Sequence, residues 1–258
     1  MSVIRTDRWL EKNYKHPMKV IKQLEKTFSG VDAADIYAHL TQFGLSLEPK
    51  HIKQLTETNH WKIVEKDYNY LKEIWKGPNI PIFIFPSNAA NRKLKQDYNS
   101  KAGLTFKDKI FLFLAEINTE SEIKALFTHE YNHTCRLNRY PKQEQAYTLL
   151  DTIILEGLAE NAVRERLGDE HTAIYTGSYN DEELKQMWEK IIMPNHHVLK
   201  SDRKHQQLLY GFHFYPKMAG YCVGDYLVRK YMNKHKVLTK DLFHLKTEDI
   251  AELGKVEE

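Results

Sequence analysis

Apolar residues recur every three or four positions over much of the chain, which is the period of an amphipathic helix. This period predicts helices in four segments, at residues 19–75, 143–167, 181–192 and 199–232. The last segment is expected to be helical in pieces, because Pro216 and Gly220 interrupt it. The chain is therefore expected to be predominantly α-helical.

Two short apolar runs differ from this pattern and predict β-strands. The first lies between Pro81 and Pro86 and is typical of an outer strand, because proline cannot donate to a strand ladder. The second covers residues 109–117. Few strands among many helices indicate an α+β fold with a small antiparallel sheet. We expect a helical N-terminal subdomain at residues 1–75 and a core at residues 76–258, in one continuous domain overall.

One predicted helix carries polar residues on its buried face. It begins near Thr119, because Thr119 and Glu122 have the spacing of a capping box, and it ends near Asn138. The apolar stripe from Leu126 to Leu137 is interrupted by three polar side chains, those of His129, Glu130 and His133. Burying three polar groups is unfavourable unless something compensates them.

The spacing of these three residues is that of the H-E-x-x-H motif. Two histidines four residues apart lie on one face of a helix, about 6 Å apart at the backbone, and can share one zinc ion. The glutamate beside them can accept a proton from the water that the metal activates. The alternative is chance: with 13 histidines in the chain, a random match has a probability of roughly 5%.

The helix predicted at residues 143–167 has two carboxylates on its own apolar stripe, Glu156 and Glu160. An unpaired buried carboxylate is costly or takes up a proton, so these acids also need a partner. One zinc ion would serve both helices, because catalytic zinc takes three protein ligands and leaves the fourth position to water. The alternative is a salt bridge with Arg136 or Arg164.

The segments THEYNH and LEGLAE together resemble the gluzincin metallopeptidases, in which a glutamate on the helix after H-E-x-x-H is the third zinc ligand. The run EGLA at residues 156–159 is similar to the signature around that ligand in aminopeptidase N-type enzymes. This resemblance implies a thermolysin-like zincin core in which His129, His133 and Glu156 bind Zn²⁺. It also implies that Glu160 orients His129. Over most of its length, including GYCVGDYLV, the chain resembles the YjaZ-type family of predicted zinc-dependent proteases of bacilli.

Departures from related patterns narrow the expected activity. A metzincin would carry a third histidine where this chain has Arg139. The G-[AG]-M-E-N element that binds a free amino terminus in aminopeptidase N-type enzymes is absent, and FPSNAAN stands in that region. An endopeptidase is therefore favoured over an aminopeptidase. In gluzincins an edge strand before the motif helix pairs with the substrate backbone, and residues 109–117 are expected to do so here.

Peptide hydrolysis also needs a donor for the developing oxyanion. Two aromatic-rich segments offer candidates, Tyr221 in AGYCVGDY and His213 in YGFHFYP. The alternative for both is a place in the core, where aromatic-rich segments are often found.

Composition limits the partners and the location. The net charge is only +3 and there is no basic run, which argues against a nucleic-acid partner. The two cysteines lie outside any C-x-x-C pair and favour a reducing compartment. The N-terminal residues lack the apolar region of a secretory signal, and no segment is apolar enough to span a membrane. The sequence thus predicts a cytoplasmic protein.

The resulting hypothesis is a zinc-dependent metallopeptidase that hydrolyses peptide or protein substrates with Glu130 as the general base. The alternative is a non-catalytic or regulatory protein with the same zinc site. A closed structural site would need a fourth protein ligand, and the sequence has no second pair of ligands at a suitable spacing.

Overall fold

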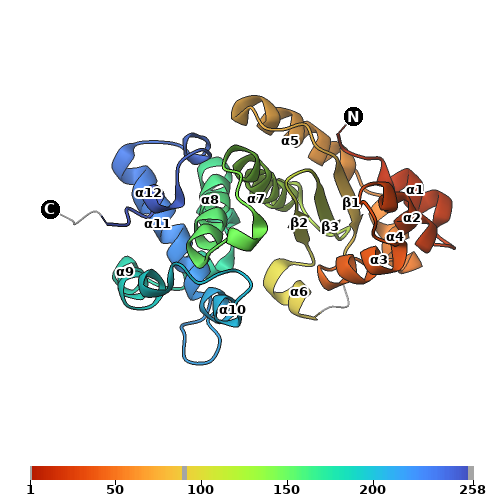
Figure 1. Cartoon of the computed structure of the whole chain (residues 1–258). Coiled ribbons are helices and arrows are strands. Elements are labelled where there is room, and N and C mark those ends of the chain that lie inside the picture. Colours follow the sequence, from red (N-terminus) through yellow and green to blue (C-terminus); the bar gives the residue numbers. More distant parts are fainter. Residues whose placement is uncertain (1, 89–91, 255–258) are drawn as a thin grey trace. The chain divides into compact units, whose positions relative to one another are not determined.

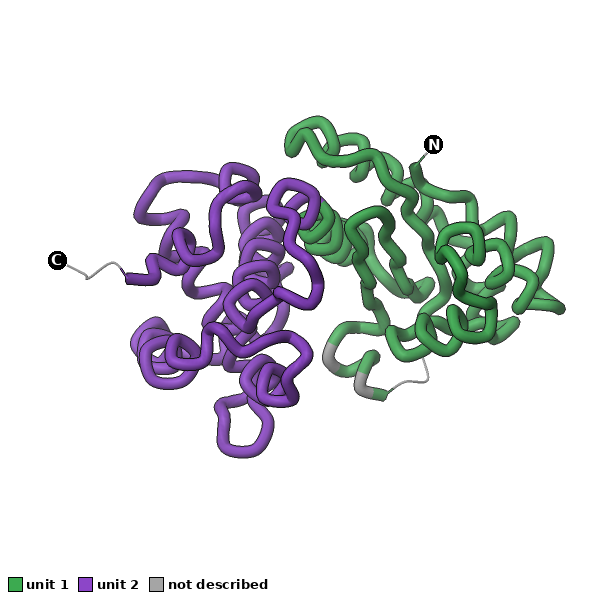
Figure 2. Tube along the Cα trace, viewed as in Figure 1, with its two compact units in different colours: residues 1–134 green, residues 135–258 purple. Residues whose placement is uncertain are grey.

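The computed structural model describes residues 2–88 and 92–254. Internal contacts group the chain into two compact units, Met1–Thr134 and Cys135–Glu258, and the division falls inside one helix (Figure 2). This division lies later in the chain than the boundary expected after residue 75, and that expectation about domains stays a prediction. Among the described helices, none has the length and apolar character that crossing a membrane requires.

The first unit contains the sheet and most of the helices expected at residues 19–75 (Figure 1). Its helices are α1 (Thr6–Asn13), α2 (Met18–Lys22), α3 (Ala33–Gln42), α4 (Pro49–Thr56), α5 (His60–Trp75), α6 (Arg92–Tyr98) and the larger part of α7 (Glu120–Arg139). Its strands are β1 (Ile82–Pro86), β2 (Ala102–Thr105) and β3 (Ile110–Leu114). Helices α1 and α4 pack against β1, so the N-terminal helices and the sheet share one core.

The sheet is mixed and has the strand order β1-β3-β2. Ile82 of β1 lies opposite Ile110 in the parallel ladder, and Ala102 of β2 lies opposite Phe113 in the antiparallel one. The expectation of an antiparallel sheet was therefore wrong. The long connection from β1 to β3 explains the difference, because such a connection lets the second strand return in the same direction. The expectation that β1 is an outer strand is confirmed.

Strand β3 occupies the middle of the sheet, and all five of its side chains are fully buried. A strand covered on both faces reads as a continuous apolar run, which is why the sequence revealed β3 but not its place in the order. Its backbone pairs with β1 on one side and with β2 on the other. The expectation that residues 109–117 form an edge strand that pairs with substrate was thus wrong.

Helix α7 begins and ends close to the expected limits. The Thr119 amide donates to Glu122 Oε2 at 2.8 Å, and the Glu122 amide lies 3.3 Å from Thr119 Oγ1, which completes the capping box. Tyr131 holds the middle of the helix against α5: its ring stacks on Trp75 with centroids 6.0 Å apart, and its hydroxyl donates to the Pro78 carbonyl oxygen at 2.9 Å.

The second unit is helical in its described part. Its elements are the end of α7, α8 (Leu149–Leu167), α9 (Asp181–Met187), α10 (Arg203–Tyr210), α11 (Ala219–His235) and α12 (Thr247–Ile250). A π-helical turn, Trp188–Ile192, extends α9 to the residue where the sequence predicted its end. Helices α8 and α11 pack along one another and carry much of the core of this unit.

Two helix limits differ from those expected. Helix α8 begins at Leu149 and not near residue 143, because Thr148 and Asp151 form a capping box that starts it there. It ends as predicted before Gly168, whose φ of 97° favours glycine. The break before α11 includes Pro216, as expected, but Gly220 lies within the first turn of α11 and does not interrupt it.

Candidate metal centre

His129 and His133 lie one turn apart on α7. The centres of their rings are 4.5 Å apart, and the ring planes are nearly perpendicular, at 85°. Only 8% of His133 is exposed. Two imidazoles that leave the same helix face at this separation can bind one ion, provided that further oxygen or nitrogen ligands complete its coordination.

Glu130 is held against strand β2. The Thr105 hydroxyl donates to Glu130 Oε2 at 2.6 Å and lies 3.1 Å from the Glu130 carbonyl oxygen. At Gly103, two residues earlier on the same face of β2, an added methyl group would overlap the Glu130 carboxylate. The Glu130 carboxylate is therefore buried against β2, at the point where Gly103 leaves the strand without a side chain.

Neither Gly103 nor Thr105 was predicted from the sequence as a site residue. The run AGLT contains a glycine and too few residues for a period to show, so β2 itself was not predicted. Glycine within a strand marks a close approach of another group, so Gly103 could have been found only if β2 had been predicted first.

Glu156 and Glu160 lie one turn apart on α8. Glu160 is buried, and its Oε2 accepts a hydrogen bond of 2.8 Å from the Ala173 amide. Glu156 is partly exposed. Glu160 thus contacts the segment at residues 169–177, which supplies a backbone donor.

The arginines considered as their salt-bridge partners bind elsewhere. Arg136 Nη1 donates to the carbonyl oxygens of Leu242, Phe243 and Leu245, at 3.0, 3.0 and 2.6 Å. Arg164 pairs with Asp225 at 2.7 Å. These contacts of the two guanidinium groups therefore do not support the alternative in which they neutralise Glu156 and Glu160.

Tyr175 feels the charges of both glutamates and was not predicted as a site residue, because no motif spacing marks it in the sequence. Burial raises the pKa of Tyr175 well above its ordinary value, and the charges of Glu160 and Glu156 raise it further. Its hydroxyl therefore remains protonated at neutral pH and can act as a hydrogen-bond donor.

The two oxyanion candidates from the sequence lie in different surroundings. The ring of Tyr221 in α11 packs against that of Tyr175 in a tilted arrangement, with ring centroids 5.2 Å apart and planes at 54°, and its hydroxyl lies 3.3 Å from that of Tyr210. His213 is exposed in the loop between α10 and α11, in the left-handed conformation with φ of 62°. Tyr221 thus belongs to an aromatic cluster with Tyr175 and Tyr210, whereas His213 lies in an exposed loop.

Glycines let α8 and α11 approach closely at the glutamates. A methyl group at Gly157 would overlap the backbone of Gly224, and one at Gly224 would overlap the backbone of Ile153. Gly157 directly follows Glu156 in the chain. The position of Glu156 is therefore tied to a contact between two helix backbones.

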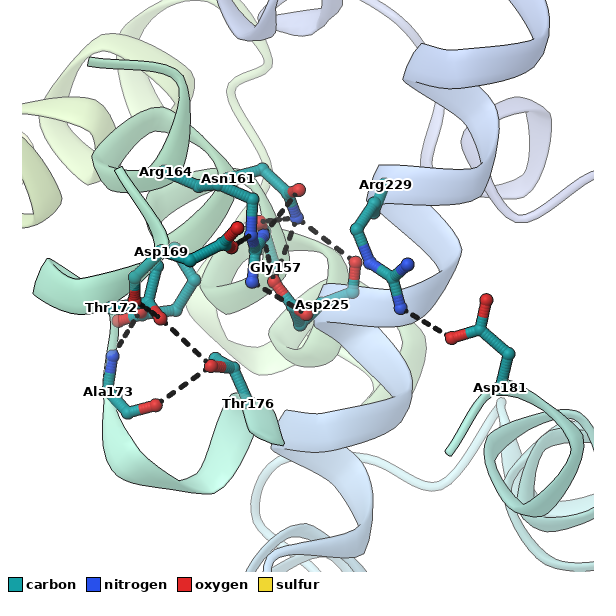
Figure 3. Close-up of polar contacts among 11 residues, drawn as sticks. Gly157, Asn161, Arg164, Asp169, Thr172, Ala173, Thr176, Asp181, Asp225 and Arg229 are labelled. Atoms are coloured by element: carbon teal, nitrogen blue, oxygen red, sulfur yellow. Dashed lines mark hydrogen bonds and ion pairs between the residues drawn. The ribbon is translucent and has the colours of Figure 1, made fainter. Parts of the chain in front are cut away.

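A polar network joins α8 to α11 one turn after Gly157 in α8 (Figure 3). Asn161 Nδ2 donates to the Gly157 carbonyl oxygen at 2.8 Å and to the Asp225 carbonyl oxygen at 3.0 Å. Arg164 donates to Asp225 Oδ1 at 2.7 Å and to Asp169 Oδ1 at 2.6 Å. Burial raises the pKa of Asp225, and the hydrogen bond and charge of Arg164 only partly offset this effect.

The network also fixes the loop beside Glu160. Thr172 donates to the Asp169 carbonyl oxygen at 2.7 Å, and Thr176 donates to the Ala173 carbonyl oxygen at 2.9 Å (Figure 3). These bonds hold the loop in the conformation in which the Ala173 amide reaches Glu160. The network thus positions both α8 and the Ala173 amide, which donates to Glu160.

Comparison with known proteins identifies the family to which the chain belongs. Residues 60–252 match the family described as "Predicted Zn-dependent protease (DUF2268)". The "Uncharacterized protein YjaZ" of Bacillus subtilis (strain 168) is 39% identical over 248 residues, which cover 93% of this chain and 95% of that protein. No solved structure matches the chain. The matched residues span most of the sequence and include both motif helices, so the chain belongs to the family of predicted Zn-dependent proteases.

Proposed function

We propose that this protein is a zinc-dependent endopeptidase of the gluzincin type, in which His129, His133 and Glu156 bind the zinc ion. The donor chemistry supports the proposal, because these three residues form a group that could hold a metal ion. Two imidazole nitrogens and one carboxylate oxygen are a ligand set that zinc takes in hydrolytic enzymes. Bound zinc would supply a Lewis acid that activates water for attack on a peptide carbonyl.

The observation that supports catalysis, and not metal binding alone, is the burial and hydrogen bonding of Glu130. It is buried next to His129 on the same helix, and one of its oxygens accepts from Thr105. Metal binding by the histidines requires no carboxylate at this position. We assign Glu130 as the general base that takes the proton of the attacking water and passes it to the leaving amine.

Other residues have supporting roles in the proposal. Glu160 accepts the free ring N–H of His129 and thereby selects the tautomer that binds zinc. Tyr221 and His213 are the oxyanion donors proposed from the sequence, and Tyr175 joins them because its ring packs against that of Tyr221. Tyr175 and Tyr221 have the better support, since their rings pack against each other while His213 is exposed.

The substrate strand is reassigned from β3 to β2. Both β1 and β2 end the order β1-β3-β2, but Ile82 of β1 already pairs on its outer side with the backbone of Ser2 and Ile4, so we assign the outer edge of β2 as the one that a peptide extends. Strand β2 is also the strand that contacts Glu130. We propose that an extended substrate pairs with β2, which brings its backbone to the strand that contacts the base. Residues 89–91 of the FPSNAAN segment lie outside the described residues, so this proposal does not use them.

The other function to consider is a non-catalytic zinc-binding protein. Such a protein would hold the same metal with His129 and His133 and would have no use for a buried, hydrogen-bonded Glu130. The two functions make opposite predictions for one conservative substitution, so a single set of variants decides between them.

Metal analysis tests the ligand assignment. The wild-type protein should contain one zinc ion per chain. His133→Ala and Glu156→Gln should lose zinc, whereas Glu160→Gln should retain it with weaker affinity, by roughly 10–100-fold. Zinc content that is unchanged in His133→Ala would refute the site, and loss of zinc in Glu160→Gln alone would exchange the roles of the two glutamates.

Hydrolysis of an unfolded protein tests catalysis. Glu130→Gln keeps the size of the side chain and should retain zinc, but its activity should fall by roughly 10²–10⁴-fold, because the amide cannot accept the proton. Glu120→Gln, which changes an exposed glutamate at the start of the same helix, is the matched control and should remain fully active. A zinc-loaded wild-type protein that cleaves nothing, or a fully active Glu130→Gln variant, would refute the proposed function.

A further inference from the structure

Strand β2 contacts the proposed base, Glu130, through a glycine and a threonine. Gly103 and Thr105 are two positions apart, so they lie on the same face of the strand, and both contact Glu130. Ala102 and Leu104 point to the other face. The contact with Glu130 is thus made by the face of β2 that has a hydroxyl at one position and no side chain at the other.

The hydroxyl of Thr105 binds one oxygen of the carboxylate. Its distance of 2.6 Å to Glu130 Oε2 is in the range of charge-assisted hydrogen bonds between a hydroxyl and a carboxylate. Threonine is β-branched, so its side chain has few rotamers and the direction of the donor is well defined. The bond therefore restricts the rotation of the Glu130 side chain about its last torsion.

Gly103 leaves room for the second oxygen. The atom that an added methyl group would meet first is Glu130 Oε1. Any side chain at position 103 would push the carboxylate out of the place in which Thr105 holds it. The glycine and the threonine thus specify one orientation of the carboxylate between them.

We infer that Thr105 is a positioning residue of the proposed peptidase: it holds the Glu130 carboxylate in the orientation that receives the proton, with Gly103 providing the space. This inference rests on the proposed function, and it goes further by making β2 the support of the base as well as the proposed partner of the substrate. Small displacements of a reacting group lower rates strongly, so removal of the hydroxyl should affect turnover and not binding.

Kinetics of two substitutions give the first test. Thr105→Val keeps the branched shape without the hydroxyl and should lower kcat by roughly 10–100-fold, with KM changed by less than about 2-fold. Thr105→Ser restores the donor and should return kcat to within about 3-fold of the parent. Thr128→Val removes a hydroxyl that donates to a backbone carbonyl on the same helix, and this control should keep the parental kcat. A Thr105→Val variant with parental kcat, or a serine variant as slow as the valine variant, would overturn the inference.

A double-mutant cycle separates positioning from a general structural role. If Thr105 acts through Glu130, Thr105→Val should cause no further loss of the residual activity in the Glu130→Gln background. An equal further loss in that background would show that the hydroxyl acts on the fold or on another group, and would overturn the inference.

Crystal structures of the metal-free wild-type and Thr105→Val proteins give a test without activity. The Glu130 carboxylate should occupy a different rotamer or several rotamers in the variant, whereas β2 and α7 should keep their backbone positions. An unchanged carboxylate would overturn the inference. If the wild-type protein hydrolyses no peptide, the proposed function fails, and this comparison still decides whether Thr105 orients Glu130.

Discussion

The histidine-bearing part of α7, in residues 1–134, and the glutamate-bearing part of α8, in residues 135–258, are held in place by different contacts. Around Glu130 the contacts join a side chain to a strand. The Thr105 hydroxyl donates to the carboxylate, and the carboxylate fills the space that Gly103 leaves. Around Glu156 they are between helix backbones, since Gly157 of α8 meets Gly224 of α11. The first arrangement can adjust by a rotamer change, and the second cannot.

This difference matches the proposed roles of the two parts. A general base must take up and release a proton during each turnover, so its carboxylate needs orientation more than a rigid backbone. A metal ligand must stay at a fixed distance, and a contact between two backbones provides that. The comparison therefore predicts that substitutions in the first part affect rate more than stability, and that those in the second affect stability and metal binding.

The largest effect is expected from one methyl group at the contact between α8 and α11. Gly157→Ala should lower the free energy of unfolding by roughly 3 kcal/mol, because backbone atoms of Gly224 would have to move. The better helix propensity of alanine offsets up to about 1 kcal/mol of the strain. Gly103→Ala should cost only about 1 kcal/mol, because the Glu130 side chain can turn away.

Urea unfolding of the metal-free proteins measures both changes. Gly177→Ala is the control, since no atom lies near the position of its added methyl group. Equal destabilisation by Gly157→Ala and Gly103→Ala would contradict the contrast between a backbone contact and a side-chain contact.

An intermediate effect is expected from the buried ion pair of Asp225. Asp225→Asn keeps the shape but leaves the Arg164 guanidinium without its buried charge partner, and it should destabilise the protein by roughly 2 kcal/mol. Zinc affinity, measured by competition with a chelator, should fall because the network positions α8 and the loop beside Glu160. The matched control is Asp181→Asn, which removes an exposed pair with Arg229 and should change stability by less than about 0.5 kcal/mol. Equal effects of the two substitutions would argue against the network as a support of α8.

The smallest effect is expected from two buried histidines, one in each part of the molecule. Burial lowers the pKa of His60, whose Nε2 lies 3.0 Å from the Ala115 carbonyl oxygen, and of His205, whose Nε2 lies 2.9 Å from Thr152 Oγ1. Below pH 6.5 the unfolded chain takes up protons at these sites before the folded chain does. Stability from these sites should therefore be complete above pH 6.5 and decrease as the pH falls toward the lowered folded-state values.

Unfolding midpoints from pH 5 to pH 7.5 test this direction. His60→Gln and His205→Gln keep a polar side chain that does not titrate, so each should reduce the loss of stability between pH 6.5 and pH 5 relative to the wild type. A reduction in only one variant would show that the two parts of the molecule differ in their response to acid. An increased loss in either variant would contradict the lowered pKa of that histidine.

Local sequence patterns determined the helices that carry the proposed site. The Thr119–Glu122 capping box, the i, i+4 spacing of His129 and His133, and the stop at Gly168 all depend on residues within one or two turns of each other. Such interactions form wherever the sequence occurs, so they could be read without the fold. The start of α8 differs from the expected one because the Thr148–Asp151 capping box begins the helix at Leu149. This capping box is also a local pattern.

The tertiary structure alone decided the strand order and the partners of the two carboxylate-bearing helices. The pairing of β1 with β3, the contact of Thr105 with Glu130, and the pairing of Arg164 with Asp225 join residues 25 or more positions apart. No spacing rule connects such residues, because the chain between them can take many paths before packing selects one. The sequence therefore determined which residues could carry chemistry and on which helices they lie, whereas the tertiary structure decided which neighbours orient them.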